Sequence, residues 1–109
     1  MRRDSALKGS APVFAALGDE TRLRVVSRLC SGGAASIARL TMGSSVTRQA
    51  ITKHLRVLAG AGLVRSRRSG RERLWELRPD RLKLARESLD AISRQWDETL
   101  GRLKELVER

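Results

Sequence analysis

The residues best suited to chemistry in this chain lie in one short amphipathic segment, residues 47–58. Apolar residues recur there at the spacing of one buried helix face: Ala50, Ile51, Leu55 and Leu58. The opposite face carries cationic, amide and hydroxyl side chains, at Arg48, Gln49, Thr52, Lys53 and Arg56. Such groups form hydrogen bonds with guanine and adenine edges and bind phosphates. The pattern therefore predicts a helix that contacts DNA in its major groove.

A second basic segment follows a few residues later. Arginines recur through a predicted β-hairpin, at Arg65, Arg67, Arg68, Arg71 and Arg73. Ser69-Gly70 is predicted as its two-residue turn, which would place Val64 opposite Trp75. Arg68 and Arg71 would then flank the turn, and DNA phosphates would relieve the repulsion between such like charges. A polar-faced helix followed by a basic hairpin is the layout of a winged helix-turn-helix.

The distribution of charge supports this interpretation. The formal net charge is +11, and residues 48–73 hold eight Lys/Arg against the single acid Glu72. Residues 79–109 hold seven basic and seven acidic residues and are neutral. Concentration of the excess on one segment indicates a polyanionic partner. A solvated basic face without a ligand is the alternative.

The N-terminal elements follow from turn and cap residues. Residues 1–10 are predicted as a flexible tail, and residues 11–109 as one domain. Pro12 suits the first turn of a helix, and Asp19 suits the N-cap of a second helix. This second helix is expected to bury a stripe formed by Leu23, Val26, Leu29 and Cys30.

The remaining elements complete a recognisable order. A short helix is expected at about residues 37–42, and a long last helix begins at Pro79. Thr47 is expected chiefly to cap the DNA-contacting helix, and it is also counted among the DNA-binding residues because the N-terminus of this helix could receive a phosphate. The predicted fold class is mainly α with a small β-hairpin wing. It is a winged helix-turn-helix in the order α, α, α, recognition α, β, β, α.

Two further apolar stripes predict self-association. They lie on the first and last helices, at Val13, Phe14, Leu17, Leu89, Ile92, Trp96 and Leu103. Soluble monomers rarely leave such stripes exposed. We therefore expect a homodimer, with the N- and C-terminal helices forming its interface, and a two-fold symmetric DNA site.

The cysteine and histidine content limits other chemistry. Cys30 is the only cysteine, so no internal disulfide can form and a reducing compartment fits. We expect Cys30 to be a small buried hydrophobe, with a redox sensor as the alternative. His54 is expected to be a partly buried packing residue, with a ligand or switch as the alternative. A cytoplasmic location is expected, because neither a membrane-spanning apolar run nor a signal core is found.

The chain resembles the ArsR/SmtB family of bacterial winged-helix repressors. Residues 14–22 (FAALGDETR) are similar to the family's opening "ALGDPTRL", and residues 48–58 (RQAITKHLRVL) to its "SxHLxxL" recognition helix. Gly62-Leu63-Val64 matches the joint between recognition helix and wing, and the similarity covers roughly residues 12–108. The resemblance implies a dimer joined through its first and last helices. It also implies repression of transcription until an inducer binds.

The departures from the family concern metal sensing. Relatives that sense metal use paired cysteines on the helix before the recognition helix, whereas residues 36–42 (SIARLTM) contain none. Others use Asp and His on the last helix, which here contains no His. One Cys and one His cannot supply a thiol- or imidazole-rich tetrahedral site. We therefore expect that the protein binds no metal and no cofactor. The resemblance does not identify its effector.

The expected function is sequence-specific DNA binding by a dimeric transcriptional repressor that does not respond to metal and often controls its own operon. A basic RNA-binding or ribosome-associated winged-helix protein is the alternative. Readers of single-stranded RNA usually display several aromatic residues for base stacking, and this chain has one Phe, two Trp and no Tyr. No enzyme is expected, because no nucleophile-base pair, carboxylate pair or phosphate-binding glycine loop is found.

Overall fold

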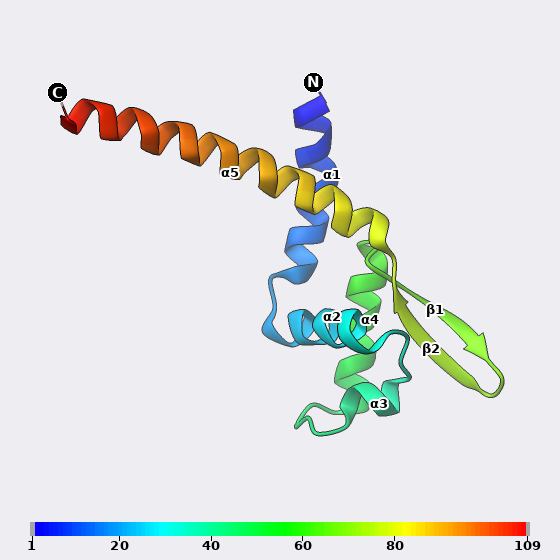
Figure 1. The fold of residues 1–109 in the computed structure, drawn as a ribbon. Helices are drawn as coiled ribbons and strands as arrows, with labels where there is room; N and C mark the ends of the chain where they lie inside the picture. Colours follow the sequence, from blue (N-terminus) through cyan, green and yellow to red (C-terminus); the bar gives the residue numbers. More distant parts are fainter. Residues whose placement is uncertain (1, 109) are drawn as a thin grey trace.

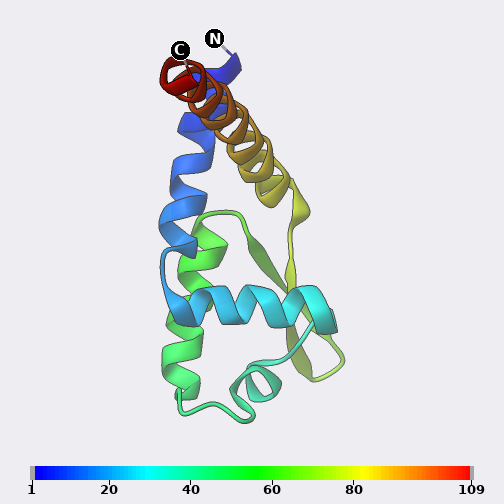
Figure 2. The same cartoon turned by 60° about the vertical axis from the view of Figure 1, so that its left-hand side comes forward.

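The computed structural model describes residues 2–108 and contains five helices and one β-hairpin in that part of the chain (Figures 1 and 2). A core of α2, α3 and α4 carries the hairpin at one side, and α1 crosses the long α5 at the other end. The predicted fold class, a mainly helical winged helix-turn-helix, is confirmed. The elements are α1 (Arg2–Leu17), α2 (Glu20–Gly32), α3 (Ile37–Thr41), α4 (Arg48–Gly60), β1 (Val64–Ser69), β2 (Glu72–Leu77) and α5 (Pro79–Glu108).

Side-chain caps determine where three of the helices begin. The Asp19 carboxylate accepts from the Arg22 backbone N–H at 3.0 Å, and Thr47 Oγ1 accepts from the Ala50 N–H at 3.1 Å. Both caps were predicted. Ser36 caps α3 in the same way, through the Arg39 N–H at 3.2 Å. Each cap satisfies a donor that the helix itself leaves unpaired.

The core lies between α4 and the elements around it. Ile51, Leu55 and Leu58 are at most 2% exposed, so the predicted inner face of α4 is confirmed, with Ala50 half-buried at its margin. The prediction for α2 was partly wrong: Val25, Val26 and Leu29 are buried, whereas Leu23 and Cys30 are exposed. Both stripes have helical spacing, and packing of α2 on α4 selects between them.

The hairpin has a register two residues away from the predicted one. Ser69 pairs with Glu72, so the turn is Gly70-Arg71, and Gly70 adopts the positive φ of 62° that glycine tolerates best. Val64 therefore pairs with Leu77, and Trp75 with Ser66. A shift of two residues keeps every side chain on its expected face. Val64 and Trp75 are accordingly buried and attach the hairpin to the core.

The N-terminal prediction was wrong in two respects. Residues 2–10 belong to α1 rather than to a flexible tail, and Pro12 lies inside this helix instead of opening it. Ser10 is fully buried, and its Oγ lies 2.7 Å from the Oγ of Ser88 on α5. Pro12 leaves one helix hydrogen bond of α1 unmade, and α1 packs against α5.

Helix α5 extends far beyond its crossing with α1 (Figures 1 and 2). Its early residues Ala85 and Ser88 are buried, whereas its later part exposes a series of large apolar side chains. These are Leu89, Ile92, Trp96, Leu100, Leu103, Leu106 and Val107, which together are called the α5 stripe below. Within residues 2–108, no helix is long and apolar enough to cross a membrane.

Candidate DNA-binding surface

The outer face of α4 carries the predicted DNA-contacting residues in positions open to solvent. Arg48, Gln49, Lys53 and Arg56 are all exposed. Thr52 is half-buried, and its hydroxyl donates to the Arg48 carbonyl at 2.8 Å, so it is less available than its neighbours. Because Thr47 caps the helix just before this set, Arg48 and Gln49 project from a well-defined first turn.

The hairpin arginines are divided between the two faces of the ladder. Arg65 and Arg67 share one carboxylate, since their Nε atoms lie 3.0 and 3.2 Å from the Glu76 oxygens. These hydrogen bonds, that of Arg65 first, hold the pKa of Glu76 below its ordinary value. Part of their positive charge is therefore neutralised within the hairpin.

The other three hairpin arginines remain unneutralised. Arg68 pairs with Arg73 on the opposite face, rather than Arg71 lying beside Arg68 at the turn as predicted. Arg73 donates to Ser66 Oγ at 2.8 Å, and Arg71 occupies the turn. Among the residues that the structure describes, the guanidinium groups of Arg68 and Arg71 have no hydrogen-bond or ion-pair partner. The sequence predicted five equivalent hairpin arginines, whereas in the structure two of them form ion pairs with Glu76 and three do not.

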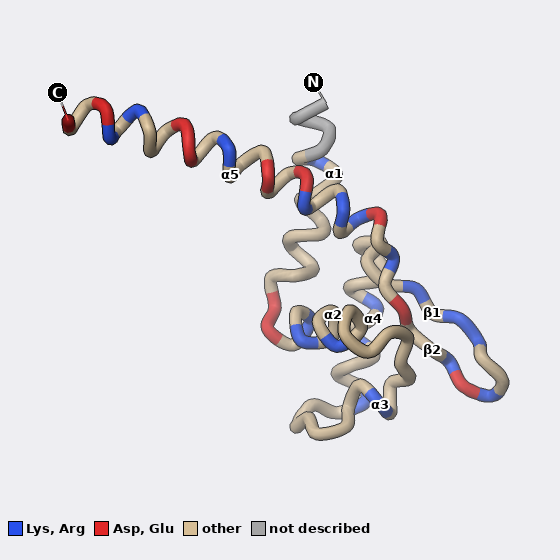
Figure 3. The backbone as a smooth tube through the Cα atoms, viewed as in Figure 1, with Lys and Arg blue, Asp and Glu red and all other residues tan. Residues whose placement is uncertain are grey.

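Figure 3 shows where the charge lies over the whole fold. Basic residues lie along both strands of the hairpin together with the acidic Glu72 and Glu76, whereas basic and acidic residues are interspersed along α5. The outer face of α4 and the hairpin, two elements that contact each other through β1, therefore both carry exposed basic side chains. This arrangement suits a phosphate backbone on either side of a groove.

His54 lies on a different side of α4, against the start of α2. Its Nδ1 is 3.4 Å from Nη1 of Arg22 and 4.0 Å from Oδ1 of Asp19, and the side chain is 21% exposed. Arg22 also donates to the carbonyl of Ala16 at the end of α1. The pKa of Asp19 is lowered, chiefly by the hydrogen bond from the Arg22 backbone N–H. His54 thus occupies the packing position expected from sequence.

The predicted interface residues have two different environments. Leu89, Ile92, Trp96 and Leu103 are exposed on α5, as an interface requires. Val13 is only 1% exposed and belongs to the protomer's own core, with Phe14 and Leu17 packed partly against that core. The prediction was therefore wrong for Val13, because α1 turns this side chain inward.

Sequence reasoning missed the part played by Arg28 of α2. Its Nη1 donates to the Leu40 and Met42 carbonyls at 2.7 and 3.3 Å, and its Nη2 to the Arg39 carbonyl at 3.2 Å. These carbonyls end α3 and begin the turn toward α4. No local signal marks this contact, because it joins positions 11 to 14 residues apart.

Comparison with known proteins identifies the architecture. The sequence model of a family described as a helix-turn-helix domain matches residues 17–67. The chain is 40% identical over 77 residues to YuzN of Bacillus subtilis, an uncharacterised HTH-type transcriptional regulator, covering 65% of this chain and 84% of that protein. It is 37% identical over 93 residues to the HTH-type transcriptional regulator Rv2034 of Mycobacterium tuberculosis, covering 85% of this chain and 83% of the relative.

A solved structure extends the likeness to nearly the whole fold. An ArsR-like transcriptional regulator from Rhodococcus sp. RHA1 superposes with a TM-score of 0.76 at 35% identity, covering 94% of this chain and 95% of the other. The chain belongs to the ArsR family. This ArsR-family protein is thus a DNA-binding transcriptional regulator with a winged helix-turn-helix, and not an enzyme. Membership favours DNA over the RNA-binding alternative.

Potential metal ligands are dispersed in the part of the chain that the structure describes. No three His, Cys, Asp or Glu side chains gather there in a group that could hold a metal ion. His54 contacts Arg22 and Asp19, and Cys30 is exposed at the end of α2.

Proposed function

We propose that this ArsR-family regulator is a homodimeric repressor that binds a two-fold symmetric operator. Each protomer would place α4 in a major groove, with Arg48 and Gln49 reading base edges. Lys53 and Arg56, together with the hairpin arginines, would bind phosphates. The observation that carries the proposal is that each protomer combines exposed basic residues on α4 and the hairpin with an exposed α5 stripe.

The shape of the protomer supports dimerisation. Its radius of gyration is 18.0 Å, whereas a compact chain of this length would have about 13 Å. The difference arises from α5, whose 30 residues span about 45 Å at 1.5 Å per residue. A helix exposing Trp96 and Leu100 over such a length is poorly stabilised alone and gains most from a second copy.

Dimerisation would also create the spacing that operator recognition needs. Two α4 helices related by a two-fold axis can enter successive major grooves of one DNA face, about 34 Å apart. We infer repression because a dimer covering such a site would compete with the transcription machinery. We further infer that the inducing signal is not a metal ion, because within the described residues of a protomer no three His, Cys, Asp or Glu side chains gather in a group that could hold one.

The test is selection of bound sequences from random DNA, followed by footprinting and titration of the selected site. We expect an inverted repeat, two protomers per site and half-sites about one helical turn apart. A reporter gene placed behind the site should be repressed by the regulator in cells. A site bound by one protomer, or equal affinity for structured RNA of the same length, would contradict the proposal.

Metal independence needs its own titration. Zinc, cadmium, nickel and arsenite should leave affinity for the selected site unchanged. A stoichiometric metal complex that weakens DNA binding by about tenfold, the effect of about 1.4 kcal/mol, would refute this part alone.

A further inference from the structure

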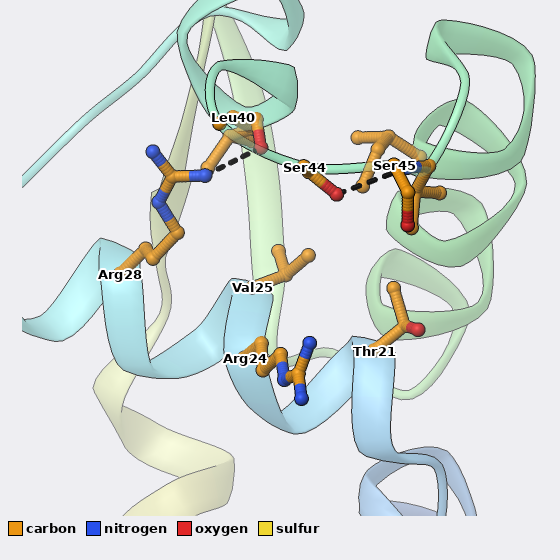
Figure 4. A pocket seen from close by; sticks show the side chains of 10 residues that line it. Thr21, Arg24, Val25, Arg28, Leu40, Ser44 and Ser45 are labelled. Carbon is orange, nitrogen blue, oxygen red and sulfur yellow. Dashed lines mark hydrogen bonds between the residues drawn. The ribbon is translucent and has the colours of Figure 1, made fainter.

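A cavity of about 410 Å³ lies between α2 and the turn that joins α3 to α4 (Figure 4). Three of its lining residues, Val25, Leu40 and Ile51, belong to the core and are at most 3% exposed. Its volume falls within the range of small-molecule sites, which span roughly 300–1,000 Å³, and about half of its lining residues are polar. The cavity lies on the far side of α2 from the α1–α5 crossing.

All the polar side chains around this cavity can donate hydrogen bonds. Arg24 and Arg28 contribute guanidinium groups, and Thr21, Ser44 and Ser45 contribute hydroxyls (Figure 4). No carboxylate is among its lining residues. Guanidinium and hydroxyl donors around apolar walls are the groups that recognise a small organic anion.

Arg24 can change partners at little cost. It forms an ion pair with Glu20 at 2.6 Å, but the two side chains are 74% and 80% exposed. Such exposed pairs contribute little to stability. A carboxylate bound in the cavity could therefore replace Glu20 as the partner of Arg24.

Arg28 connects the cavity to the turn that leads to the recognition helix. Its guanidinium donates to the carbonyls of Arg39, Leu40 and Met42, at the end of α3. In the turn that follows, Gly43 has a positive φ of 72°. The Ser44 hydroxyl accepts a hydrogen bond from the Val46 N–H at 3.1 Å. A ligand that accepts hydrogen bonds from the Arg28 guanidinium would weaken the contact between α2 and this turn.

We propose that this cavity is an effector site for a small organic carboxylate with a short apolar body. The carboxylate pairs with Arg24 and Arg28, and the apolar body lies against Val25, Leu40 and Ile51. Occupancy draws Arg28 away from α3, shifts the start of α4 and weakens operator binding. The predicted effect on operator binding rests on the proposed function. Binding of the anion to the cavity does not depend on it.

The first experiment uses the full chain without DNA. Indole-3-acetate and hexanoate are titrated into ¹⁵N-labelled protein, with indole-3-acetamide and hexanamide as neutral counterparts. The acids should shift the amide signals of residues 21–28 and 43–46 saturably, and the amides should bind about tenfold more weakly or worse. Equal binding of acids and amides, or the absence of shifts in these segments, would overturn the proposal.

A pair of variants tests the named contacts. Arg24→Gln should weaken binding of the acids by about ten- to a hundredfold, because a charged hydrogen bond is lost. Arg86→Gln, an exposed arginine of α5 outside the cavity, should leave it unchanged. Circular dichroism of both variants checks that the fold is retained. Unchanged binding in Arg24→Gln would overturn the assignment.

The second experiment adds operator DNA. Saturating indole-3-acetate should weaken operator binding by about fivefold or more, and bound operator should weaken probe binding by the same factor. A backbone phosphate offers the same charge as a carboxylate. If Arg24→Gln lowers DNA affinity while neither acid binds the free protein, the cavity receives a DNA phosphate and the effector proposal fails. If the acids bind but no operator does, the proposed function fails and the anion site stands.

Discussion

Arg68 and Arg73 lie directly opposite each other in the β1–β2 ladder, on the hairpin face that also carries Trp75. Like charges held directly opposite each other destabilise the ladder. Arg68→Thr should therefore raise the free energy of unfolding while it lowers affinity for DNA of any sequence. Urea unfolding and DNA titration measure the two effects.

A matched control for that variant is Arg71→Thr. Arg71 lies in the turn without a cross-strand partner in the ladder, so its loss should weaken DNA binding without a gain in stability. If Arg68→Thr instead destabilised the protein, the opposed pair would not be a source of strain.

The recognition helix and the hairpin should contribute differently to specificity. Gln49→Ala or Arg48→Ala should cost about 1–3 kcal/mol on operator and relax the sequence preference, because base contacts are lost. Arg71→Ala should weaken operator and random DNA alike and flatten the salt dependence by about one unit per lost phosphate contact. Titrations of both DNAs at several salt concentrations separate these outcomes. The opposite division of effects would refute the assignment of roles.

The α5 stripe should hold two protomers together. Trp96 is 62% exposed near the middle of the stripe, so Trp96→Ala should shift the dimer toward monomer at micromolar concentration. Sedimentation equilibrium measures the shift. Glu98→Ala, on the other side of the same helix, is the matched control and should leave the dimer intact. A wild-type chain that sediments as a monomer of 12.1 kDa would exclude the dimer.

The cap of α4 should matter for both stability and DNA binding. Thr47→Ala leaves the Ala50 N–H without its partner and should lower the free energy of unfolding by about 0.5–2 kcal/mol. It should also weaken operator binding, because the first turn carries Arg48 and Gln49. Ser45→Ala, two residues earlier in the same turn, should change stability much less. Equal losses in the two variants would argue against the cap.

Acid should weaken the hairpin through Glu76. Hydrogen bonds from Arg65 and then Arg67 lower its pKa from the ordinary value of 4.5, so the folded state binds the proton less readily than the unfolded chain. The carboxylate thus stabilises the fold above pH 4.5, and this contribution is lost as the pH falls through the lowered folded-state pKa.

The check on Glu76 is a comparison of unfolding in acid and near neutrality. Glu76→Gln should lose less stability than the native chain between about pH 6 and about pH 3. Glu72→Gln, which removes a carboxylate at the tip of the same hairpin, should behave like the native chain. Parallel loss in the native chain and Glu76→Gln would show that the two arginines do not act on Glu76.

Local patterns determined which segments become helices, where several begin and which side of α4 is buried. The caps Asp19 and Thr47 act on backbone groups three residues away, and the apolar repeat of Ile51, Leu55 and Leu58 follows the pitch of one helix. The motifs of residues 14–22 and 48–58 also identified the family. Such signals lie within a few residues of each other, so no knowledge of distant contacts is needed to interpret them.

Only the tertiary structure decided which of several possible faces is buried and which charges are paired. Leu23 and Val25 lie on equally plausible stripes until α2 packs on α4, and Ser10 becomes helical and buried because α5 covers it. The contact of Arg28 with the α3 carbonyls, and the cavity beside it, likewise join segments that are apart in sequence. These contacts depend on how whole helices are oriented relative to one another. The spacing of residues along one helix does not specify that orientation.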